Sequence, residues 1–98
     1  MPATYYEGEL VRVRAIFKTQ AGVLIDPNIV NLSHRDPFPT TRILVYLTDV
    51  EVIRDSEGNY HVDIDANLPG LWTYRWWSTG LGQAAVERTF NVTAAVAV

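Results

Sequence analysis

A Pro-Gly corner that leads directly into a run carrying all three tryptophans is the feature that most constrains this chain. Proline fixes φ and glycine accepts a sharp turn, so residues 69–70 separate one element from the next. Residues 71–78 then follow the two-residue period of a β-strand. One face of this strand would carry Trp72, Tyr74 and Trp76, and the other Thr73, Arg75 and Trp77. The three rings on one face predict a strand that lies against a packed core.

Residues 9–18 show the clearest apolar-polar alternation in the chain. Val11, Val13, Ala15 and Phe17 would point inward, and Arg12, Arg14 and Lys18 outward. This pattern predicts a half-buried strand with a basic outer face. No stretch shows helical periodicity over the ~11 residues that would reveal a helix.

Other short runs have the β-prone composition of strands and are separated by turn signals. They span residues 23–25, 29–33, 42–48, 50–54, 60–64 and 84–92. The last run should pair with residues 71–78 as a hairpin. About seven short strands at this spacing predict an all-β antiparallel sandwich.

Composition limits what the chain can be. Its 98 residues predict a single domain over residues 1–98, with a core over about 7–92 and a flexible or partner-bound tail at 93–98. The absence of cysteine excludes disulfides and thiolate metal sites. A net charge of −3 without a basic run predicts no nucleic-acid partner. No apolar run approaches the ~18 residues of a membrane span, and residues 1–6 lack the pattern of an export signal.

Three motifs carry a resemblance to known proteins. They are Glu7-Gly8-Glu9-Leu10-Val11 with the following Ile16-Phe17 and residues 21–27, Gly58-Asn59-Tyr60, and Pro69-Gly70-Leu71-Trp72-Thr73-Tyr74. Together they resemble the immunoglobulin-like or fibronectin type III-like modules of tailed-bacteriophage virion proteins and bacterial surface proteins. The resemblance implies an immunoglobulin-like sandwich of about seven strands.

As a function, the resemblance implies a small virion component, such as a capsid decoration, neck, baseplate or fibre module. Such a protein assembles in the cytoplasm of the bacterial host and remains in the virion. Its expected partner is a capsid or tail protein present in many copies, and the chain itself could form a homo-oligomer on such a symmetric scaffold.

The side chains offer little for catalysis, so we expect no enzyme, cofactor or metal site. His34 and His61 are the only histidines, and both are expected to be solvated. Asp63 and Asp65 would lie on one strand face roughly 7 Å apart. A calcium site there needs further oxygens from loop residues such as Asp49, Glu51 or Asp55. An enzyme would require Asp63 and Asp65 in a deep pocket with a strongly raised pKa.

Five residues are the candidate contacts for a protein partner. Trp77 beside Arg75 has the composition of a binding hot spot, unless a loop or Arg75 itself covers the ring. Phe38 lies between two prolines, either as a preformed contact or as a plug on the sandwich end. Arg12 and Arg14 would extend a basic patch towards Arg75 if their strands share a sheet.

Two further modes of binding fit the sequence. In a carbohydrate-binding module, exposed Trp77 with Tyr46 or Trp76 would stack on the sugar rings of a cell-surface glycan. The small apolar residues 94–98 could add a strand to the sheet edge of a neighbour.

Overall fold

A computed structural model describes residues 3–80 and 84–95 of the chain. Within these residues, eight strands form two sheets and no helix is present that could cross a membrane. The strands are β1 (Ala3–Tyr6), β2 (Leu10–Ile16), β3 (Ile29–Arg35), β4 (Thr41–Val45), β5 (Ile53–Ser56), β6 (Asn59–Asp65), β7 (Gly70–Thr79) and β8 (Ala85–Thr93).

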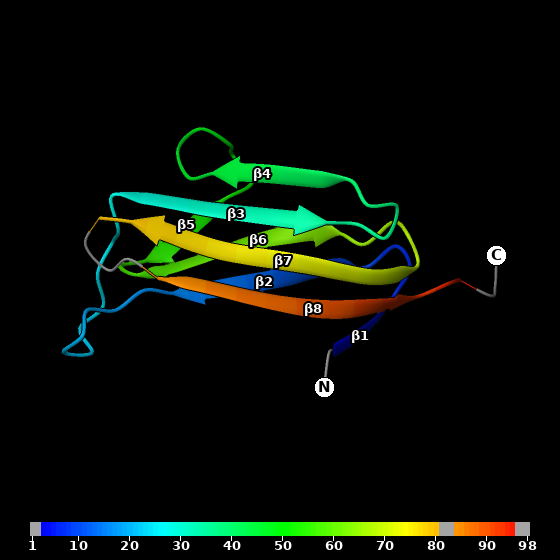
Figure 1. The fold of residues 1–98 in the computed structure, drawn as a ribbon, viewed down its shortest axis with the longest axis horizontal. Helices are drawn as coiled ribbons and strands as arrows, with labels where there is room; N and C mark the ends of the chain where they lie inside the picture. The colour runs from blue at the N-terminus through cyan, green and yellow to red at the C-terminus, as the bar shows by residue number, and fades with distance from the viewer. Residues whose placement is uncertain (1–2, 81–83, 96–98) are drawn as a thin grey trace.

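The two sheets pack face to face as layers. One sheet has five strands in the order β1-β8-β7-β3-β4, and the other has three in the order β2-β6-β5. Neighbouring strands are antiparallel except for β1, which pairs with β8 in parallel. In the view of Figure 1, β3, β7 and β8 lie in front of β2, β6 and β5. The predicted all-β class is therefore confirmed.

The core lies between the layers and follows the predicted alternation. On β2, Val11, Val13 and Ala15 are buried while Arg12 and Arg14 are exposed. This pattern continues at the buried Phe17. An amphipathic strand gains burial energy only when its apolar face meets a second layer, and β2 meets the five-stranded sheet in this way.

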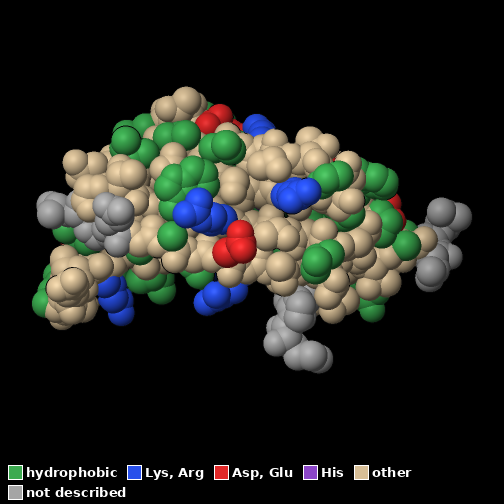
Figure 2. Space-filling model, viewed as in Figure 1, with side chains coloured by type: hydrophobic (Ala, Val, Ile, Leu, Met, Phe, Trp, Pro, Cys, Tyr) green, Lys and Arg blue, Asp and Glu red, His purple; other side chains and the backbone are tan. Residues whose placement is uncertain are grey.

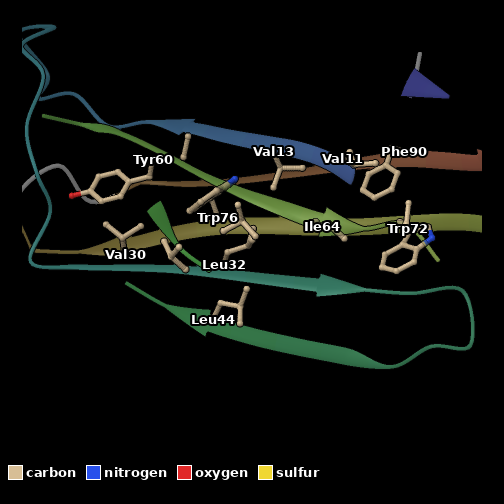
Figure 3. Close-up of a cluster of buried hydrophobic side chains, with 14 of the residues drawn as sticks. Val11, Val13, Val30, Leu32, Leu44, Tyr60, Ile64, Trp72, Trp76 and Phe90 are labelled. Atoms are coloured by element: carbon tan, nitrogen blue, oxygen red, sulfur yellow. The ribbon is translucent and has the colours of Figure 1, made fainter. Parts of the chain in front are cut away.

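The tryptophan strand β7 supplies the largest rings of the core. Trp72 and Trp76 are buried, and Tyr74 is partly buried against them. Trp72 stacks on Phe90 of β8 with ring centroids 5.8 Å apart, as Figure 3 shows. Its Nε1–H donates to the carbonyl of Leu68 at 2.9 Å. Among the described residues, the Trp76 Nε1–H is buried without an acceptor, so this ring contributes through packing alone.

The Pro-Gly corner has a specific steric cause. Gly70 adopts a φ of 127°, which L side chains rarely adopt. A Cβ on Gly70 would also lie 2.8 Å from the Pro37 ring. Glycine is therefore needed both for the turn and for the close approach of the loop between β3 and β4.

Several element boundaries differ from the sequence prediction, but the predicted hairpin of β7 and β8 is confirmed. The sequence did not predict β1, which is only four residues long and lacks a clear alternation. Residues 23–25 form no strand and contribute only the bridge between Lys18 and Leu24. Residues 50–52 belong to the connection after β4, and β5 begins at Ile53. The part of the predicted tail at 96–98 lies outside the described residues.

Candidate protein-binding surface

The outer sheet face is the solvent side of the five-stranded sheet. Strand register sets its composition, because every second residue of each strand points away from the core. Along the middle of the face, Trp77 lies between Asn31 of β3 and Ala85 of β8, and Arg75 lies between Ser33 and Glu87. Figure 2 views this side and shows hydrophobic side chains beside basic and acidic ones.

Trp77 and Arg75 form a single unit on this face. The Arg75 guanidinium lies 5.1 Å from the centroid of the Trp77 ring, a cation–π distance. Trp77 is half-buried and Arg75 is exposed. Of the two alternatives for Trp77, the structure shows the ring partly covered by Arg75. No salt bridge reaches Arg75 among the described residues, although Glu87 is its neighbour in the sheet register.

Apolar side chains lie on the β4 side of this pair, beyond the polar neighbours on β3. Ile43 of β4 faces the same side, because it is the register partner of Ser33, and it is 58% exposed. Val45 follows two residues later and is half-buried. Beyond it, Leu47 is 86% exposed in a turn and has a φ of 73°, which is uncommon for a branched apolar residue. This end of the β3–β4 hairpin therefore displays apolar area without burying it.

Phe38 lies at the other end of the same hairpin. The carboxylate of Asp36 accepts hydrogen bonds from the backbone N–H of Phe38 at 2.9 Å and of Thr40 at 2.8 Å. The loop is thus held in a defined turn while the Phe38 ring remains 68% exposed. The ring is not a plug on the sandwich end. Trp77 is the register partner of Asn31, four residues before β3 ends at Arg35, so the loop that carries Phe38 begins roughly 13 Å along the strand from Trp77.

Arg12 and Arg14 do not extend this surface. They lie on β2, in the three-stranded sheet, whereas Arg75 lies on β7 in the other sheet. The two outer faces point in opposite directions, so a continuous basic patch is wrong. Arg12 instead donates to both carboxylate oxygens of Asp63, at 2.8 and 3.1 Å. This hydrogen bonding lowers the pKa of Asp63 below its usual range.

The acidic and histidine side chains of the described residues bear on the alternative of an enzyme or a metal site. Asp63 and Asp65 line a pocket of about 390 Å³, together with residues of both sheets that include His34, Arg42 and Trp72. The pKa of Asp63 is lowered, which is the opposite of what a general acid needs. Among the described residues, no group of three or more histidine, aspartate or glutamate side chains could hold a metal ion. The absence of catalysis stays a prediction.

The two histidines are less solvated than the sequence predicts. His61 points away from the core, between its register neighbours Arg14 of β2 and Ile53 of β5, and it is buried. Its Nδ1 lies 2.7 Å from the carboxylate of Asp55. His34 is half-buried, its ring centroid lies 6.1 Å from that of Trp72, and burial lowers its pKa. The expectation of solvated histidines is therefore wrong, because His61 is buried and His34 is half-buried.

Asp26 is the polar residue whose importance sequence reasoning missed. Its carboxylate accepts from Arg54, from the backbone N–H of Gly58 at 2.9 Å and from the hydroxyl of Tyr60 at 2.9 Å. These bonds, with the one from Arg54 the strongest, lower its pKa to about 2. Burial and the bond to Asp26 raise the pKa of Tyr60 to about 12. Both partners lie in motifs that the sequence shows, Asp26-Pro27 and Gly58-Asn59-Tyr60. The two motifs are far apart along the chain, so no local pattern predicts that they meet.

The aromatic platform expected for sugar binding does not form from the predicted rings. Trp76 is buried in the core. Tyr46 is partly buried, and its ring packs edge-on against Tyr60 at 5.1 Å. Trp77 therefore has neither ring beside it. Comparisons with protein-family models, curated proteins and solved structures find no match to this chain. The described residues thus define a two-layer all-β domain whose outer sheet face combines Arg75 and Trp77 with exposed apolar side chains.

Proposed function

We propose that this chain is an immunoglobulin-like β-sandwich that acts without catalysis, as a small structural or assembly module. It binds a protein partner through the outer sheet face, with Arg75 and Trp77 at the centre and the Phe38 loop at the periphery. Its setting is the particle of a tailed phage, where the partner is a capsid or tail protein present in many copies.

The order of the strands supports the immunoglobulin-like assignment. Variable-type immunoglobulin domains place strands G, F, C and C′ in one sheet and B, E and D in the other. The orders β8-β7-β3-β4 and β2-β6-β5 follow that arrangement. The chain departs from antibody domains because it has no cysteine, and its buried tryptophans lie on β7 instead of the strand in position C. The assignment concerns the arrangement of strands and implies no antibody-like role.

The observation that carries the binding proposal is the unit of Arg75 and Trp77 on the outer sheet face, with exposed apolar side chains on the neighbouring β4. Tryptophan and arginine are the residues most enriched at binding hot spots, where they act in desolvated, closely packed centres. The cation–π contact orients both side chains before a partner arrives, which reduces the entropy lost on binding. The exposed Ile43 beside them supplies apolar area that a partner would bury.

The resemblance of residues 7–27, 58–64 and 69–74 to modules of virion proteins supports the proposed setting. On a repeated surface, many copies of a modest contact give a stable assembly. Capsid, portal or tail genes beside the reading frame, and sedimentation of the chain with particles, are the expected results. Neighbouring genes for secreted hydrolases would count against this setting.

Photo-cross-linking tests the surface directly. A photoreactive phenylalanine replaces Ile43 on the outer sheet face or, as the matched control, Ile53 on the other sheet. Both isoleucines are exposed strand residues. In cells that assemble the particles, the Ile43 variant should form an adduct with one abundant particle protein, and adding Trp77→Ala should remove it. Equal adducts from both positions, or binding to glycans without any protein adduct, would refute the proposal.

A further inference from the structure

The four edge strands of the two sheets differ in how their free backbone groups are occupied. The edge strand β1 has four residues, and the carboxylate of Glu9 accepts the backbone N–H of its last residue, Tyr6, at 2.7 Å. On β4, the Asp49 carboxylate accepts the N–H of Val45 at 2.8 Å, and the Val45 carbonyl accepts from the N–H of Asp49 at 2.8 Å. Both strands are therefore too short or too occupied to take a further strand over any length.

The remaining two edges contrast sharply. β5 has four residues, and its register with β6 shifts between Arg54 and Ser56. Such an irregularity bends a strand and discourages further pairing. β2 has seven residues and pairs with β6 from Leu10 to Ile16 without any shift. Within the described part of the chain, β2 is thus the long, regular edge.

The backbone groups on the free side of β2 can be identified from the hydrogen bonds at its two ends. The Ala66 N–H donates to the Glu9 carbonyl at 3.0 Å, and the Phe17 N–H donates to the Gly58 carbonyl at 2.8 Å. Bonding alternates along an antiparallel pair, so the odd-numbered residues between these ends bond to β6. The N–H and C=O groups of the even-numbered residues therefore point away from the sheet. No backbone hydrogen bond to them is found among the described residues.

These even-numbered residues also define the side chains that an added strand would meet. They are Leu10, Arg12, Arg14 and Ile16, in the order apolar, basic, basic, apolar. Leu10 is 68% and Ile16 62% exposed, and both arginines are exposed. Backbone groups and side chains therefore offer a regular template with one defined charge pattern.

We propose that the free edge of β2 accepts an extended segment of a protein partner as an additional strand. The segment carries acidic side chains opposite Arg12 and Arg14 and apolar side chains opposite Leu10 and Ile16. Its backbone bonds to the edge supply affinity without sequence preference, and the facing side-chain pairs select the sequence.

The charge pattern favours such a partner over a second copy of this chain. In antiparallel pairing of two β2 strands, the register that uses all seven residues places Arg12 opposite Arg14 of the copy, twice. Directly opposed like charges destabilise a strand pair. An acidic strand converts both contacts into attractions.

Arg14 is the residue that should decide the charge preference. Arg12 already bonds to Asp63, so part of its charge is balanced within the chain. No salt bridge to Arg14 is present among the described residues. Its neighbour across β6 in the register is His61, whose ring contacts Asp55 instead.

An NMR titration with two synthetic heptapeptides tests the proposal on the intact chain. The acidic probe is Ile-Thr-Glu-Thr-Glu-Thr-Ile, and in the matched probe lysine replaces glutamate. The acidic peptide should shift the amide signals of Leu10, Arg12, Arg14 and Ile16 and bind about fivefold more tightly than the lysine peptide. Arg14→Glu should reverse this preference.

Arg14→Pro removes an N–H that faces the free edge and no bond to β6, so the fold should persist while peptide binding is lost. Arg14→Ala keeps the N–H and should retain weaker binding with less charge preference.

Three results would each overturn the proposal. The first is that the amide shifts centre on β4 or β5. The second is equal affinity for both peptides in the wild type and in Arg14→Glu, and the third is dimerisation of the free chain through β2. If Arg14→Pro fails to fold, the reversal by Arg14→Glu still decides. The result is independent of the Ile43 cross-link, which reports on the other sheet.

Discussion

The two sheets differ in how far their exposed charged side chains are paired. On the three-stranded sheet, Arg12 contacts Asp63, Arg54 contacts Asp26 and the His61 ring contacts Asp55, whereas Arg14 has no salt bridge among the described residues. Several of these pairs join segments that are distant in the sequence. Exposed ion pairs contribute little individually, but they leave few charges for a partner to use.

On the five-stranded sheet, Arg42 of β4 contacts Glu51, but the described residues provide no salt bridge for Arg35 or Arg75. Exposed apolar residues accompany them, including Ile43 and Leu71. A face with unpaired charge and unburied apolar area still has interactions to gain. Both sides expose apolar residues, among them Leu10 and Ile16 on the three-stranded side. The difference therefore lies in the charges: the unpaired arginines of the five-stranded outer face remain available to a partner, whereas several of those on the three-stranded sheet are already paired.

The largest test of this contrast compares adjacent tryptophans on the two sides of β7. Trp76→Ala should lower the free energy of unfolding by about 3–5 kcal/mol, because it leaves a cavity in the core. Trp77→Ala should cost about 1–2 kcal/mol, since the ring is half-buried on the outer sheet face. Chemical denaturation measures both. An equal loss from the two variants would show that the outer sheet face is a structural layer and not a free surface.

A smaller effect is expected on the three-stranded side. Asp26→Ala leaves the Gly58 N–H and the Tyr60 hydroxyl without their acceptor, which should cost about 1–3 kcal/mol in denaturant unfolding. Asp65→Ala is the matched control, because Asp65 is an exposed aspartate on β6 with no salt bridge among the described residues. This variant should change the free energy of unfolding by less than about 0.5 kcal/mol. Similar losses from both variants would contradict a specific stabilising role for Asp26.

How much of this could be predicted from the sequence depends on the distance over which each feature is encoded. The two faces of β2 and β7 follow from the local alternation of side chains, so the inward positions of Val13 and Trp76 were predicted correctly. Sheet membership is set by pairing between distant segments, and the supposed patch joining Arg14 to Arg75 fails for that reason.

The same limit explains the missed polar contacts. Asp26 meets Tyr60 across 34 positions of the chain, and the burial of His61 depends on how β5 pairs with β6. The loop that leaves Phe38 exposed is also held by a hydrogen bond that the Phe38 N–H donates to the Asp36 carboxylate, and the two prolines alone do not predict this bond. Composition therefore predicted the candidate residues of the outer sheet face, but only the register of β3, β7 and β8 places them relative to one another.

The smallest predicted effect is a dependence of stability on acid. Hydrogen bonding from Arg54, Gly58 and Tyr60 lowers the pKa of Asp26 from 3.8 to about 2 in the folded chain. A carboxyl with a lowered folded pKa contributes its stability in full above the unfolded pKa and loses it as the pH falls through the folded one. The stabilisation by ionised Asp26 should therefore fade between about pH 4 and about pH 2.

Urea unfolding of the wild type and Asp26→Asn across this range measures the effect, because the other carboxyl groups cancel in the difference between them. The difference in unfolding free energy should shrink as the pH falls, with a shallow slope since the carboxylate is partly open to solvent. Asp65→Asn should show no such slope. If the difference in unfolding free energy between the wild type and Asp26→Asn stays constant with pH, Asp26 acts as a neutral hydrogen-bond acceptor. The ion pair of Asp26 with Arg54 then contributes nothing measurable to stability.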